Sequence, residues 1–137
     1  MAGLGIRLDA NDRMIINGAG IHFLTSAQIR LTNQARFLFG RQLLPPEQAN
    51  TPARRIYYAL QTAYVGTPEE RTSAFSEARY YIEIFSKETT SETARELLSS
   101  ALASAEQEDL YTALKLARRI IRHEDAVLGA TKKDLGV

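Results

Sequence analysis

The segment from Leu43 to Val65 carries the residues best suited to bind a ligand. Thr51 can cap a helix and Pro52 can begin it, since the first helical N–H needs no partner. At about 3.6 residues per turn, one face of this helix is apolar and the opposite face presents Arg54, Arg55, Tyr58 and Gln61. Guanidinium groups can meet phosphate, a tyrosine ring can stack on a base, and an amide can bind a base edge. This chemistry suits unpaired RNA.

The same face also fits a purely structural interpretation. An arginine pair with a tyrosine lying over a neighbouring element is common on ordinary solvated helices. From side-chain chemistry alone, this structural interpretation is favoured over RNA binding.

A second basic face occurs in the last predicted helix, at about residues 108–128. One side of it carries Lys115, Arg118, Arg119 and Arg122. Cations late in a helix also complement the helix dipole, which is the structural alternative. If the two helices are neighbours, their basic faces form one groove.

Glu124 falls within the apolar arc of this last predicted helix, so we expect it to bind an arginine of the sheet half or a partner.

An apolar pair marks a third candidate surface. Tyr80 and Ile84 lie four residues apart and face away from the Phe75 and Ile82 side of their predicted helix. A helix that is apolar on two sides contacts a second element or a second chain. The pattern leaves both alternatives open, an internal contact with the sheet or a partner-binding surface.

The composition of the 137-residue chain removes several classes of chemistry. It contains no cysteine, which excludes disulfides, thiolate nucleophiles and Cys-ligated metals. Its two histidines, His22 and His123, fall in different halves, and no zinc-hydrolase spacing or phosphate-binding glycine loop is present. We therefore expect no enzyme activity, no cofactor and no metal. No apolar run is long enough to span a bilayer, and the N-terminus lacks the pattern of a secretory signal, so we expect a cytoplasmic protein that contacts no membrane.

The net charge of +1 hides an asymmetry between the two halves. Residues 1–60 carry seven arginines and no lysine against three acidic residues, a net charge of +4. The remainder carries ten basic and thirteen acidic residues, a net charge of −3. Arginine binds phosphate in a forked geometry and stacks on bases, so the N-terminal half favours an anionic partner.

The hydrophobic pattern changes its period along the chain. Residues 4–8 and 13–39 show the alternation of short strands, with Asn17-Gly18 as a hairpin turn that Ala19-Gly20 would widen. A sheet this small cannot bury enough surface alone, so its apolar face should pack on the helices. After Pro45-Pro46 come four helical patterns, at about 52–65, 68–86, from a cap near Ser91, and 108–128 with a stop at Gly129.

These patterns predict an α+β fold in which a small antiparallel sheet precedes a four-helix domain. The expected organisation is a sheet subdomain at 1–40, a proline-containing joint at 41–51, a helical domain at 52–129 and a flexible tail at 130–137.

Two segments resemble a known family. The stretch Leu43-Leu44-Pro45-Pro46-Glu47, followed by Thr51-Pro52-Ala53-Arg54-Arg55-Ile56-Tyr57-Tyr58-Ala59-Leu60-Gln61, is similar to the signature of the FlbT flagellar biosynthesis regulators of alphaproteobacteria. The stretch from Tyr111 to Glu124 is similar to the last helix of that family, and the strand-rich start also fits. The resemblance covers nearly the whole chain. It implies a cytoplasmic, non-enzymatic, post-transcriptional regulator that acts on the 5′ untranslated region of flagellin mRNA and works with or against the small protein FlaF.

Two hypotheses follow. The first is a translational regulator that binds flagellin mRNA through the basic faces. The second is an adaptor that binds FlaF or flagellin, in which Tyr80 and Ile84 form the contact and any effect on RNA is indirect. The near-zero net charge supports the second, since RNA-binding domains are usually more basic. The sequence is compatible with a homo-oligomer, and it does not determine whether the protein represses or activates.

Overall fold

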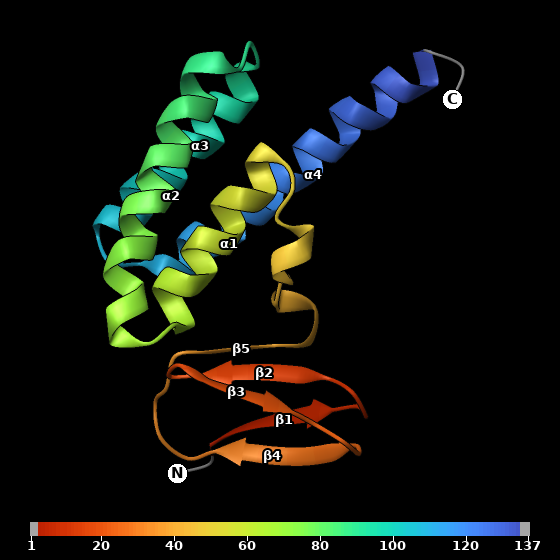
Figure 1. The fold of residues 1–137 in the computed structure, drawn as a ribbon, viewed down its shortest axis with the longest axis vertical. Helices are drawn as coiled ribbons and strands as arrows, with labels where there is room; N and C mark the ends of the chain where they lie inside the picture. The colour runs from red at the N-terminus through yellow and green to blue at the C-terminus, as the bar shows by residue number, and fades with distance from the viewer. Residues whose placement is uncertain (1–2, 135–137) are drawn as a thin grey trace.

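The computed structural model describes residues 3–134, which form five strands and four α-helices in the predicted α+β order (Figure 1). The strands are β1 (Leu4–Leu8), β2 (Arg13–Ile16), β3 (Ala19–His22), β4 (Ala27–Leu31) and β5 (Phe37–Phe39). Two 3₁₀ turns follow, η1 (Gly40–Gln42) and η2 (Pro46–Gln48). The helices are α1 (Pro52–Val65), α2 (Pro68–Glu88), α3 (Glu92–Glu106) and α4 (Leu110–Asp134).

The strands form two antiparallel sheets in place of one. β1 pairs with β4, while β2 lies between β3 and β5. A small core between the two sheets contains Ile6, Leu8 and Met14, with Phe37 and Phe39 packed against it. The expectation that the sheet packs its apolar face directly on the helices was therefore only partly right. The three-stranded β3–β2–β5 sheet has two apolar faces. Met14 faces the small core, whereas Ile15 of β2 and Leu38 of β5 lie on the opposite face and join the helical core.

The β2–β3 turn docks this sheet onto the helices. Asn17 and Gly18 have φ angles of 48° and 87°, the left-handed values of a two-residue hairpin turn. Ala19-Gly20 lie in β3, so the prediction of a widened turn was wrong. The Gly18 N–H donates to the carbonyl of Val65 at 2.8 Å, and Arg36 Nε donates to the carbonyl of Tyr64 at 3.0 Å. Both acceptors lie at the end of α1.

The helices begin at the residues that the capping pattern predicts. The side chains of Thr51, Thr67 and Ser91 accept hydrogen bonds from the first turns of α1, α2 and α3. α1 packs against both α2 and α4, and α3 packs against α4. The central position of α1 explains why eight of its residues are buried.

The end of α4 differs from the prediction. The helix continues through Gly129 to Asp134, so the expected stop at Gly129 was wrong. Residues 135–137 lie outside the described residues. A glycine inside a helix costs only about 1 kcal/mol, and no proline follows to end the helix. The final turns of α4 extend away from the other helices (Figure 1).

Gln61 lies at the joint between the sheets and the helices, and its prediction as an exposed residue was wrong. It is 5% exposed. Its Oε1 accepts from the backbone N–H of Leu44 at 2.8 Å, and its Nε2 donates to the Leu44 carbonyl at 3.2 Å. Leu43 and Leu44 pack against the helical core, so their backbone needs partners from the protein. Gln61 provides them and cannot face a ligand.

Replacing Gly18 should weaken the docking of the sheet. An alanine Cβ at this position would lie 3.2 Å from Cα of Thr67, at a φ of +87°. The left-handed backbone alone costs a non-glycine residue about 1–2 kcal/mol. We expect Gly18→Ala to lower the urea midpoint, whereas Gly20→Ala, whose Cβ meets nothing within 4 Å, should leave it nearly unchanged. Equal midpoints for the two variants would contradict this role of the turn.

Removing the Gln61 amide should destabilise the joint. Gln61→Ala leaves the N–H and carbonyl of Leu44 without partners, which costs about 1–3 kcal/mol when such groups are buried. The matched control is Gln48→Ala, because Gln48 is exposed and its side chain has no hydrogen bond to the described residues. Urea unfolding of both variants measures the difference, and a Gln61 variant as stable as the control would refute the assignment.

Candidate nucleic-acid interface

The basic residues of α4 lie on one side of the helix and line one pocket. Asp109 Oδ1 accepts from the N–H of Thr112 at 3.2 Å and caps the helix. Ala113, Leu114, Ala117 and Ile120 form its buried face. The pocket, called the α4 pocket below, has a volume of about 260 Å³ and is lined by Leu38, Gln42, Tyr57, Tyr111, Leu114, Lys115, Arg118, Arg119 and Arg122. The structure therefore brings all four predicted α4 cations together, and no carboxylate is among the lining residues.

Arg118 is the positioned cation of the α4 pocket. Its guanidinium carbon lies 4.9 Å from the centroid of the Tyr57 ring. Its Nη2 donates to the Tyr57 hydroxyl at 2.9 Å and to the Arg41 carbonyl at 3.0 Å. The Tyr57 hydroxyl in turn donates to the Gln42 carbonyl. Arg118 thus connects α4 to α1 and to the joint, while its other N–H donors have no partner in the described part of the chain.

The other three cations are exposed and less constrained. Lys115 Nζ lies 5.0 Å from the centroid of the Tyr111 ring. Arg119 and Arg122 have no ion pair or hydrogen bond with any other described side chain. The Tyr111 ring also contacts Tyr64, with centroids 6.1 Å apart. Since two side chains already contact this ring, the geometry favours binding of phosphate over stacking of a base.

Arg54 does not belong to an exposed ligand-binding face. Its two terminal nitrogens donate to both carboxylate oxygens of Asp125, at 2.9 and 3.0 Å. The hydrogen bond from Arg54 lowers the pKa of Asp125, and the same bond raises the pKa of Arg54. A bidentate pair of this kind is specific in geometry. The pair connects the start of α1 to α4.

Glu124 also contacts α1, and its arginine neighbour is Arg54 of that helix rather than an arginine of the sheet half. Its Oε2 accepts from the backbone N–H of Ala53 at 3.0 Å, which caps the start of α1 from another helix. Its Oε1 lies 3.5 Å from Arg54 Nη1, within ion-pair range but outside hydrogen-bond geometry. The sequence could not show this contact, because the partner is 71 residues away.

The remaining predicted residues of α1 lie apart from the α4 pocket. Arg55 is exposed and Tyr58 is half-buried, and neither lines the pocket. The two basic faces therefore do not merge into one groove as expected. α1 contributes Tyr57 instead, which the hydrophobic pattern had placed in the core and which is only 3% exposed. Tyr57 and Gln42 are the polar pocket residues from outside α4, and no pattern in the sequence pointed to them.

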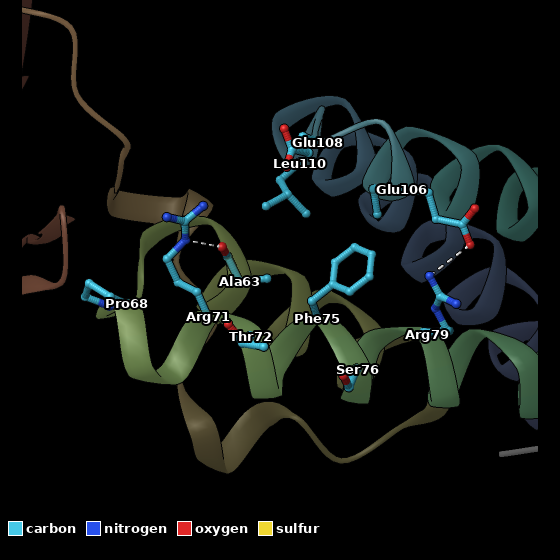
Figure 2. A pocket seen from close by; sticks show the side chains of 11 residues that line it. Ala63, Pro68, Arg71, Thr72, Phe75, Ser76, Arg79, Glu106, Glu108 and Leu110 are labelled. Atoms are coloured by element: carbon cyan, nitrogen blue, oxygen red, sulfur yellow. Dashed lines mark hydrogen bonds and ion pairs between the residues drawn. The ribbon is translucent and has the colours of Figure 1, made fainter.

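A wider groove lies between α2 and the α3–α4 turn, with a volume of about 800 Å³ (Figure 2). Phe75 and Leu110 point into it from opposite sides. Arg79 pairs with Glu106 at 3.3 Å, and Arg71 Nε donates to the Ala63 carbonyl at 2.8 Å. The two arginines of this groove therefore connect neighbouring elements, and fewer of their N–H donors are available to an anion than those of the α4 arginines.

The α2–α3 hairpin has the opposite charge to the α4 pocket. Residues 66–109 carry ten acidic and four basic residues, a net charge of −6. Tyr80 on α2 is 59% exposed, and its ring contacts that of Tyr81. Ile84 is half-buried and is not among the side chains that pack against the helical core. Tyr80 and Ile84 belong to neither of the two hydrophobic cores, which favours the surface alternative over an internal contact with the sheet.

The two histidines remain separate. His123 Nε2 lies 2.9 Å from the Ser91 hydroxyl, which caps α3, and His22 lies in β3. Among the described residues, no group of three or more His, Cys, Asp or Glu side chains is arranged to hold a metal ion. No helix in residues 3–134 combines the length and the apolar character that crossing a membrane requires.

Comparison with known proteins agrees with the resemblance of the signature segments. Over 127 residues, the chain is 28% identical to the "Probable flagellum biosynthesis repressor protein FlbT" of Brucella ovis, which covers 93% of this chain and 72% of that protein. It is 30% identical over 129 residues to the "Probable flagellum biosynthesis repressor protein FlbT 1" of Bradyrhizobium diazoefficiens, covering 92% and 85%. A Chelativorans protein of the same description is 34% identical over 61 residues, 44% of this chain and 42% of that protein.

No solved structure matches the chain at a significant level. The sequence model of the family described as "Flagellar protein FlbT" matches residues 4–128, nearly the whole chain. The chain therefore belongs to the FlbT family.

Proposed function

We propose that this protein is a cytoplasmic, non-enzymatic regulator of flagellin synthesis that binds flagellin mRNA in its 5′ untranslated region. In this proposal, RNA binding couples flagellin translation to flagellar assembly. The names of the relatives support a regulator of flagellum biosynthesis, and the word "repressor" in them favours a negative effect.

The observation that carries the RNA proposal is the α4 pocket. Four cations converge there, and no carboxylate lines it. Arg118 is held in place, while Lys115, Arg119 and Arg122 remain exposed. Cations gathered in this way attract a phosphate backbone, and the release of counterions makes such binding salt-dependent.

The low net charge does not oppose this proposal, because the charges are separated along the fold. The acidic residues concentrate in α2 and α3, whereas residues 1–60 carry +4 and the basic side of α4 faces the joint. An RNA strand that approaches α4 therefore meets a basic surface, although the α2–α3 hairpin is acidic. Phosphate contacts set orientation, and base contacts set sequence preference. Arg55 and Tyr58 are the accessible α1 residues for the second role.

A repressive effect follows from steric exclusion. A protein of 15.3 kDa bound to the leader of an mRNA occupies the strand that an initiating ribosome has to reach. Release of the protein restores translation without any covalent chemistry.

The second candidate function is that of a protein adaptor that binds FlaF or flagellin. The observation that favours it is the Tyr80 and Ile84 pair on an acidic hairpin, far more exposed than the core residues of α2. Apolar side chains at the centre of a polar surface are typical of protein-binding sites. This function and RNA binding use different elements, so they are compatible.

Truncating two α4 arginines should weaken RNA binding. We expect Arg119→Ala with Arg122→Ala to lower the affinity for flagellin leader RNA. The salt dependence should also fall, by about one unit of slope for each lost phosphate contact. Binding to purified protein across a salt series measures both quantities, and cell-free translation of a leader reporter measures the regulatory effect.

The control for this experiment removes the same charge from another surface. Arg7→Ala with Arg30→Ala deletes two exposed arginines from the β1–β4 sheet. An equal loss in both double variants would mean that overall charge governs binding and would reject the α4 pocket as the site. A loss of RNA affinity that occurs only in Arg55→Ala would place the site on the outer face of α1.

A charge at Tyr80 should separate the two functions. We expect Tyr80→Asp to abolish binding of FlaF or flagellin, or self-association, while RNA affinity is kept. The unfolding free energy should change by only about 0.5 kcal/mol, because the side chain is on the surface. Ser73→Asp adds the same charge two turns earlier on α2 and serves as the control. A large loss of stability without a selective binding defect would identify Tyr80 as structural.

A further inference from the structure

We propose that the α4 pocket holds a terminal phosphate group, the phosphate monoester at the 5′ end of an RNA or of a free nucleotide, in preference to a phosphodiester within a strand. The biological ligand in this inference rests on the proposed RNA function. The chemistry of the pocket is independent of it.

The walls of the pocket favour the end of a ligand. Four elements surround it: Leu38 comes from β5, Gln42 from η1, Tyr57 from α1 and the remaining residues from α4. Leu38 and Leu114 are 1% and 3% exposed and supply an apolar base. The volume of about 260 Å³ is near the lower limit for small-molecule sites. A pocket of this size suits one phosphate group with a single substituent better than a strand that continues in both directions.

The donors of the pocket include two that are held in place. Arg118 uses Nη2 for Tyr57 and the Arg41 carbonyl, which leaves its Nε and Nη1 as donors. Gln42 Oε1 accepts from the N–H of Phe39 at 3.0 Å, which leaves its amide NH₂ as a neutral donor. Donors that are already oriented lose less entropy when they bind an anion.

The charge of the pocket suits a dianion. A phosphate monoester carries a charge of about −1.5 to −2 at pH 7 and presents three acceptor oxygens. A phosphodiester carries a single charge. With four cations and no carboxylate among the lining residues, each additional negative charge on the ligand gains attraction without repulsion from the walls.

Arg54 keeps the nearest acidic residues of α4 away from these cations. Asp125 follows Arg122 by three residues and could otherwise pair with it on the helix surface. Both Asp125 and Glu124 are instead engaged by Arg54 of α1. The residue that the sequence suggested as an RNA contact thus leaves Arg119 and Arg122 available, and its role is that of a positioning residue.

The test compares two single-stranded RNAs of the same flagellin leader sequence, labelled at the 3′ end, one with a 5′-phosphate and one with a 5′-hydroxyl. We expect the full-length protein to bind the phosphorylated RNA about tenfold more tightly by fluorescence anisotropy. Adenosine monophosphate should compete, whereas adenosine should not. Arg119→Gln with Arg122→Gln should bring the ratio of the two affinities close to one. Arg7→Gln with Arg30→Gln, the matched pair on the β1–β4 sheet, should leave this ratio unchanged.

The outcomes separate this inference from the RNA function. The two RNAs could bind the wild-type protein equally and both lose affinity in the Arg119 and Arg122 variant. This result would overturn the terminal-phosphate assignment and would retain the α4 pocket as an RNA-binding site. Direct binding of adenosine monophosphate, measured by shifts of the backbone amide signals of residues 115–122, without binding of leader RNA would support the pocket and reject the RNA function. A preference for the 5′-phosphate that persists in the double variant would place the site elsewhere and overturn the inference.

Discussion

The backbone from Arg41 to Leu44 runs along the helices and takes hydrogen-bond partners from them, and much of the structure follows from this constraint. The Gln61 amide binds the backbone N–H and carbonyl of Leu44. The Tyr57 hydroxyl donates to the Gln42 carbonyl, and Arg118 donates to the Arg41 carbonyl. A buried backbone group without a partner would cost free energy comparable to a lost hydrogen bond. Because Tyr57 and Arg118 also bind each other, the same contacts hold α1, α4 and the joint together and create the walls of the α4 pocket.

A second constraint is the pairing of charges between α1 and α4. Arg54 binds Asp125 and Glu124, and Glu124 also caps the first turn of α1. Partly exposed ion pairs add little stability on average, so the main consequence of this pairing is the distribution of charge. It leaves the cations at 115, 118, 119 and 122 without acidic neighbours in the pocket. The basic surface thus lies on α4 rather than on the outer face of α1.

The fold separates two kinds of surface. One is the basic pocket at the joint, where sheet, 3₁₀ turn and two helices meet. The other is the acidic α2–α3 hairpin with the exposed Tyr80. The proposed function, in which the protein binds both an mRNA and a protein, needs surfaces that do not repel either partner, and this separation would supply them within 137 residues. β5 contributes to the basic pocket by supplying Leu38 and by binding Gln42 through the N–H of Phe39.

Local chemistry in the sequence determined most of the elements. Thr51, Thr67 and Ser91 act within one turn of the helices they cap, and Asn17-Gly18 acts within one hairpin, so their effects can be inferred without the fold. The placement of the four α4 cations on one side follows from helical periodicity alone. The change from strands to helices across Pro45-Pro46 was predictable for the same reason.

Only the tertiary structure decided which polar residues face solvent. The periodicity of α1 shows a polar face, but it cannot show that the joint covers Gln61 or that Arg54 is bound by residues 70 and 71 positions later. The pairing of β1 with β4, and therefore the division into two sheets, depends on contacts between distant segments. Local propensity acts over a few residues, whereas burial and charge pairing depend on which segments meet in space. For that reason the elements were predictable, and the pocket they form was not.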